Sequence, residues 1–180
     1  MMSNNYTLIH VLISVTGFFS GLVVLAGLLT AKRLNGWTAL FLTTTVLTSV
    51  TGFFFPFHGL TPGIVTGVLS VAVLAVAIYA RYARKLAGAW RMTYVISALL
   101  ALYLNVFVLI VQSFQKIPVL KRIAPTQSDP SFQITQLLVL VFFIVFTVLA
   151  ALKFKEKPTQ TTQSFQRKIN QQYYEQPTQK

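Results

Sequence analysis

Two histidines are the strongest candidates for chemistry in this sequence. His10 and His58 are its only histidines, beside three acidic residues and no cysteine. Imidazole nitrogens ligate metals and haem iron and exchange protons near neutral pH. Thiolate chemistry is excluded because it needs cysteine, and proton relays within a membrane usually need carboxylates or histidines. The two histidines therefore come first among the candidate binding residues.

Three amides complete the predicted cofactor-binding set. Asn105, Gln112 and Gln136 lie within long apolar stretches, where an amide facing lipid is costly and should face protein or water instead. Together with His10 and His58 they can serve two kinds of cofactor: haem b, ligated by two imidazoles, or a quinone headgroup held by the amides and histidines. The alternative is that both histidines are interfacial residues bonded to loop backbone.

Motifs for other chemistry are missing from the sequence. It has no His-x-x-x-His or carboxylate–histidine metal spacing, no phosphate loop and no serine nucleophile motif. We therefore expect neither an enzyme nor a metal site. The net charge of +12 is typical of nucleic-acid binders, but the lysines and arginines cluster in short stretches between apolar runs. We expect a lipid bilayer as the partner and no nucleic acid.

Five apolar runs must position these residues. A membrane-spanning helix needs about 20 apolar residues, and runs close to that length occur at 7–31, 37–55, 62–82, 92–114 and 131–152. The turn pair Asn35-Gly36 predicts a tight hairpin after the first run, and Asp129-Pro130 predicts the start of the last helix. The predicted fold is all-α, an integral membrane bundle of five transmembrane helices over residues 1–156.

The basic residues predict the orientation of this bundle. Lysine and arginine accumulate on the cytoplasmic side of membrane proteins. With five crossings, twelve of the fifteen lie on one side and only Lys116, Lys121 and Arg122 on the other. The N-terminus is then outside and the C-terminus inside, with residues 157–180 as a disordered, basic, Gln/Thr-rich cytoplasmic tail. A belt of aromatic residues should mark the inner interface: Trp37, Tyr79, Tyr82, Trp90 and Tyr94.

This orientation brings the candidate residues toward one face. Both histidines, Gln112 and Gln136 lie in the outer half, with Asn105 deeper and the 117–129 loop as a cap. Small residues at Gly17 and Gly21 (GxxxG), and again at Gly63 and Gly67, predict close helix packing within the chain rather than a dedicated dimer interface.

Three functions fit these features. The main prediction is an accessory or scaffold subunit that packs with other membrane proteins or with copies of itself. The first alternative is a small haem- or quinone-binding membrane protein with an outward-facing site at His10 and His58. The second is a small channel or permease lined by threonines and amides.

Part of the chain resembles a group of small bacterial polytopic membrane proteins with no assigned activity. The resemblance is carried by residues 84–91 (RKLAGAWR), 103–108 (YLNVFV), Gln112 and 124–128 (APTQS), and covers the third to fifth predicted helices. It implies a bacterial inner membrane and draws attention to Asn105 and Gln112. It implies nothing about His10, which lies outside the resembling part.

Overall fold

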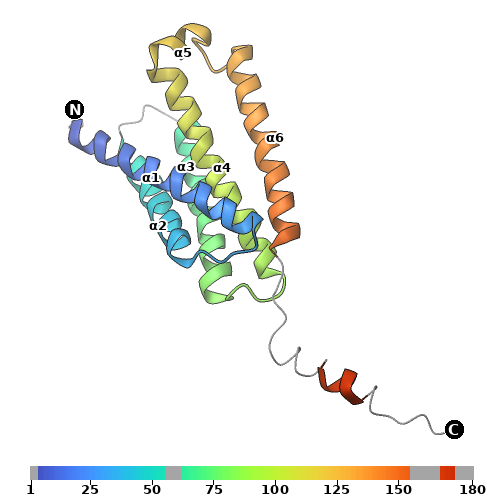
Figure 1. The fold of residues 1–180 in the computed structure, drawn as a ribbon. Coiled ribbons are helices and arrows are strands. Elements are labelled where there is room, and N and C mark those ends of the chain that lie inside the picture. Colours follow the sequence, from blue (N-terminus) through green and yellow to red (C-terminus); the bar gives the residue numbers. More distant parts are fainter. Residues whose placement is uncertain (1–3, 56–61, 155–166, 173–180) are drawn as a thin grey trace, which may run out of the picture.

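The computed structural model describes residues 4–55, 62–154 and 167–172, and all regular structure in these ranges is helical. This confirms the all-α prediction (Figure 1). The elements in chain order are α1 Asn4–Leu29, α2 Asn35–Gly52, α3 Pro62–Ile78, the π-helical turn η1 Tyr79–Ala83, α4 Trp90–Lys116, α5 Pro118–Ile123 and α6 Pro130–Lys153. Residues 167–172 form a short helix, and the rest of the predicted tail lies outside the described residues.

Four described helical segments are long and apolar enough to cross a membrane: α1, α3 continued through η1, α4 and α6. The remaining long helix, α2, has 18 residues and is rich in threonine. Thr44, Thr45 and Ser49 turn inward and are buried beside Phe41 and Leu42, whereas Thr43 is exposed. Leu47 and Val50 are exposed on its outside. Helix α2 thus buries hydroxyl and apolar side chains against the bundle and exposes apolar side chains on its outer surface.

The turn between α1 and α2 lies earlier than the sequence predicted. Asn35 and Gly36 begin α2, and the chain reverses just before them. Ala31 takes a left-handed conformation at φ 54°, and the amide of Lys32 donates to the carbonyl of Gly27 at 2.8 Å. This is a Schellman-type helix end, in which one left-handed residue satisfies the last carbonyls. The predicted hairpin is therefore present, but its turn was wrongly placed at Asn35-Gly36, and Asn35 has a tertiary role instead.

That role is to bind a buried arginine. Arg81, on η1, is only 9% exposed, and its guanidinium donates to the Asn35 side-chain oxygen at 2.7 Å. It also lies 5.1 Å from the ring centre of Tyr94, which is completely buried. Tyr94 was predicted in the interfacial belt and is instead a core residue beneath Arg81. Trp37, Tyr79 and Tyr82 are exposed at this end of the bundle, as the belt prediction requires.

The core depends on close contact between α1 and its neighbours. A side chain at Gly21 would collide with Leu102 of α4 and lie 3.0 Å from the ring of Phe41 of α2. Both are almost fully buried, in a cluster that includes Leu25, Leu74 and Leu99. The GxxxG face thus packs within the chain, as predicted.

The α5–α6 connection is braced by an acidic side chain. Asp129 occupies the N-cap position of α6, but its carboxylate accepts hydrogen bonds from the Thr126 hydroxyl at 2.8 Å and the Thr126 amide at 2.6 Å. These bonds hold the pKa of the Asp129 carboxyl below its usual value. The predicted helix start at Asp129-Pro130 is confirmed, with the carboxylate turned back to the loop.

Replacing Gly21 by alanine should reduce stability. The new methyl group has no room between α2 and α4, and overpacking of this kind costs about 1–3 kcal/mol. Gly36→Ala is the matched control, because no atom lies within 4 Å of a side chain there. Unfolding in detergent with increasing dodecyl sulfate measures both. Equal stability of the two variants would show that α1 does not depend on close contact with α2 and α4 at Gly21.

Replacing Asn35 by alanine should also destabilise the bundle. The substitution removes the acceptor of the buried Arg81 guanidinium, and a hydrogen bond to a charged group contributes about 1.5–3 kcal/mol. Asn35→Asp keeps an acceptor and should retain wild-type stability. If the alanine variant unfolds at the wild-type midpoint, Arg81 does not depend on this bond.

Candidate functional site

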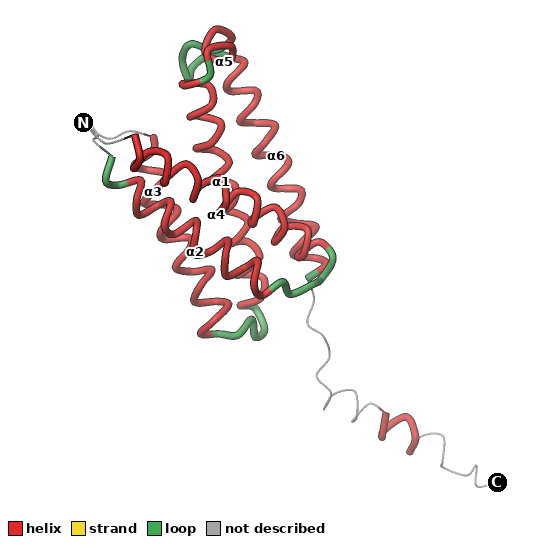
Figure 2. The backbone as a smooth tube through the Cα atoms, turned by 60° about the vertical axis from the view of Figure 1, so that its left-hand side comes forward, coloured by secondary structure: helices red, strands yellow, loops and turns green. Residues whose placement is uncertain are grey.

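A cavity of about 590 Å³ lies between α1, α2, α3 and α4, in the half of the bundle that carries the N-terminus and α5. It arises because α1 is inclined across α4, as both views show (Figures 1 and 2). The helices touch at Gly17 and Gly21, and the earlier turns of α1 contribute wall residues of the cavity. Its volume falls in the range of ligand pockets, roughly 300–1,000 Å³.

The deep end of the cavity contains an amide without a partner. The Asn105 side-chain nitrogen is buried and makes no hydrogen bond. It lies against Gly17, where an added Cβ would be 3.2 Å from it and also 3.2 Å from the Thr44 hydroxyl. That hydroxyl already donates to the Leu40 carbonyl at 2.7 Å. A buried donor of this kind costs about 1–3 kcal/mol unless it is satisfied.

The α2 wall adds a second unpartnered polar atom. The Thr48 hydroxyl lines the cavity and is buried without a hydrogen bond. Its neighbour Ser49 donates to the Thr45 carbonyl at 2.9 Å, so the Ser49 oxygen keeps only acceptor capacity. Asn105 and Thr48 therefore each bring to the wall a buried polar atom without a hydrogen bond, among both apolar and polar lining residues.

His10 is held in a defined orientation. Its Nδ1 lies 2.8 Å from the Thr51 hydroxyl oxygen, and that hydroxyl donates to the Leu47 carbonyl at 2.6 Å. With the hydroxyl proton directed there, we assign the ring hydrogen to Nδ1, which then donates to Thr51. The ring also packs edge-on against Phe55, with centroids 5.0 Å apart. Neutral His10 therefore has its lone pair on Nε2, which no described residue hydrogen-bonds.

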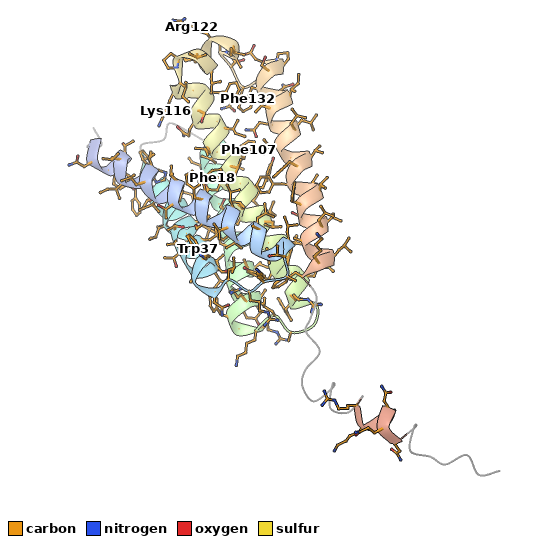
Figure 3. The ribbon with its side chains drawn as sticks, in the orientation of Figure 1. Phe18, Trp37, Phe107, Lys116, Arg122 and Phe132 are labelled. Atoms are coloured by element: carbon orange, nitrogen blue, oxygen red, sulfur yellow. The ribbon has the colours of Figure 1, made fainter. Side chains whose placement is uncertain are left out.

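The mouth of the cavity is polar and positively charged. Gln112 and Lys116 line it, one helical turn apart on α4, and both are exposed. Lys116 lies at the upper end of α4, at the end of the bundle that carries Arg122 and opposite Trp37 (Figure 3). None of the described lining residues is acidic.

The structure brings three of the five predicted site residues together and separates a fourth. His10, Asn105 and Gln112 line the same cavity. Gln136 is buried as expected, but its amide donates to the Phe107 carbonyl at 3.3 Å, between α6 and α4. It does not line the cavity, because the α4 face toward α6 is a different one. His58 lies outside the described residues, so its pairing with His10 stays a prediction.

Sequence reasoning left two residues out of the predicted site, Thr48 and Lys116. Lys116 was counted among the loop charges, although it follows Gln112 by four residues and so shares its helix face. That four-residue spacing could have identified Lys116 as a residue of the same site. The described residues hold no cluster of metal-ligating side chains.

Comparisons with known proteins give no guide to this site. No protein-family model matches the chain, and no curated protein or solved structure shows significant similarity to it. The function has to be argued from the residues themselves.

The tautomer of His10 provides a test of the site geometry. Nitrogen NMR of protein labelled at histidine should show neutral His10 protonated at Nδ1 and not at Nε2. Thr51→Val removes the acceptor, so the Nε2-protonated form should appear. Thr16→Val, on α1 but with its hydroxyl bonded to its own helix, should leave the His10 signal unchanged. A wild-type signal from the Nε2-protonated form would refute the assignment.

Proposed function

We propose that this chain crosses the bacterial inner membrane five times, with α2 as the additional span and its N-terminus outside. The inward hydroxyls and outward leucine and valine of α2 support the fifth crossing. The chain also begins α1 at the α5 end of the bundle and leaves α6 at the opposite end, which an odd number of crossings requires (Figure 1).

The absence of cysteine makes this topology testable without background. Single cysteines at Lys32, Lys85 and Lys121 should react differently with a membrane-impermeant thiol reagent in cells whose inner membrane is intact. Lys121→Cys should be labelled, and Lys32→Cys and Lys85→Cys should be protected. Labelling of Lys85→Cys with protection of Lys32→Cys would mean that α2 does not cross.

We propose that the protein's function is to bind a small, mainly apolar molecule in the cavity between α1 and α4. The observation that carries this is a cavity of ligand size whose wall includes Asn105 and His10, together with an Asn105 side-chain nitrogen that is buried and makes no hydrogen bond. Ligand sites are typically apolar pockets with a few polar groups that orient the guest. Asn105, Thr48 and His10 are such groups here, on three different helices.

This proposal develops the predicted ligand-binding alternative. A quinone ring suits the amide donor of Asn105 and the acceptor at His10 Nε2, in its oxidised and reduced forms respectively. Haem stays a prediction, because the second imidazole it calls for lies outside the described residues. The scaffold prediction loses one support, since the Gly17–Gly21 face is occupied within the chain.

A photoreactive decanol with a diazirine at the chain terminus tests binding in nanodiscs of zwitterionic lipid. Saturable labelling should appear on α1 and α4 peptides, and unlabelled decanol should compete with it. Labelling of the lipid-facing α6 peptide should not saturate and serves as the internal reference.

Filling the cavity should weaken the saturable labelling of the α1 and α4 peptides. Ser49→Leu and Ser70→Leu each place a large side chain in the wall, and affinity should fall by about tenfold, which corresponds to 1.4 kcal/mol. Ser131→Leu, exposed at the start of α6, is the matched control. Labelling of α1 and α4 that never saturates, or that survives both fillings, would refute the proposal.

A further inference from the structure

We infer that the cavity, taken as the binding site proposed above, selects a single-chain anionic amphiphile whose acidic headgroup lies at Lys116. The inference rests on the proposed function and specifies the chemical class of the ligand. The shared chemistry is one hydrocarbon chain with a carboxylate or phosphate at its end.

The charge of the wall is the first argument. Lys116 is the one charged residue among the described lining residues, and no carboxylate of the described chain opposes it. Asp129, the described acidic residue, is engaged by Thr126 in the α5–α6 connection. A cationic guest would meet an uncompensated ammonium group at the mouth, while an anionic guest would neutralise it.

The arrangement of polar groups along α4 is the second argument. Lys116, Gln112 and Asn105 share one face of the helix, and the distance along its axis from Lys116 to Asn105 is about 16 Å at 1.5 Å per residue. Between them the wall is formed by apolar side chains such as Val108 and Leu109. The charged group is at the end of the helix and the apolar wall runs inward, which is the order of groups in a lipid molecule.

The neighbouring residues refine this placement. Gln112, one turn below Lys116, lies about 6 Å deeper along the helix and can donate to an oxygen close to the headgroup. Asn105 lies beyond it and can donate to an oxygen carried further along the chain, for example a carbonyl or hydroxyl. The cavity volume of about 590 Å³ falls in the range that holds one drug-sized ligand, so we commit to a single chain.

The experiment uses four diazirine probes with the same decyl chain and different headgroups. Alcohol, carboxylate, phosphate and trimethylammonium probes are compared on the full chain in zwitterionic nanodiscs, with labelling of the α6 peptide as reference. The carboxylate and phosphate probes should label the cavity peptides about fivefold more strongly than the alcohol probe. That is the gain in affinity expected when an anion binds next to one interfacial lysine. Trimethylammonium should label them less than alcohol, and the stronger of the two anions distinguishes a fatty-acid-like from a lysophospholipid-like ligand.

Two substitutions assign the preference to Lys116. Lys116→Gln should reduce labelling by the anionic probes to the level of the alcohol, and Lys116→Glu should make trimethylammonium the preferred probe. Lys121→Gln and Lys121→Glu on α5 change the charge at the same end of the bundle but not in the cavity, and should leave the preference unchanged.

The outcomes separate the two proposals. The inference is wrong if the alcohol probe labels the cavity saturably and the anionic probes label it no better. It is also wrong if the Lys121 variants change the headgroup preference as much as the Lys116 variants do. In both cases the proposed binding function stands. If no probe labels the cavity saturably, both are wrong.

Discussion

The close approach of α1 to α2 and α4 at Gly17 and Gly21 is the contact on which the rest of the bundle depends. Helices in a bilayer associate through van der Waals packing, because lipid chains are as apolar as the side chains. Two glycines one turn apart let α1 touch both neighbours, with Phe41 and Leu102 filling the space. A helix fixed at its middle and inclined to α4 leaves a space on one side of the contact, and the cavity occupies it.

Polar groups in this bundle are satisfied in two ways, and the difference locates the site. Most serines and threonines donate to their own helix, as Ser20 and Thr45 do, and contribute little to recognition. The Asn105 side-chain nitrogen does not, and it stays buried without a hydrogen bond in a residue that lines the cavity. At the opposite end, Arg81 is satisfied by Asn35 and an aromatic ring. The cavity end combines buried polar atoms that lack a partner with space for a ligand.

The sequence predicted the helices better than the site. Apolar run length and basic clusters located α1, α3, α4 and α6 to within a few residues, because these signals are local. The grouping of His10, Asn105 and Gln112 was also predictable, from helix spacing combined with a common depth. The separation of Gln136 was not, since it depends on which face of α4 meets α6. The tertiary bond of Asn35 to Arg81 likewise has no local signature.

The position of α6 has a consequence for how this architecture can vary. It packs on α4 and α1, most of its surface faces outward, and it contributes no residue to the described wall of the cavity. Among the described residues, its side-chain hydrogen bond to the bundle is on the far side of α4, at the Phe107 carbonyl. Helix α6 therefore adds apolar outer surface to the bundle but no described residue to the cavity wall. Substitutions on its outer face leave the described lining of the cavity unchanged.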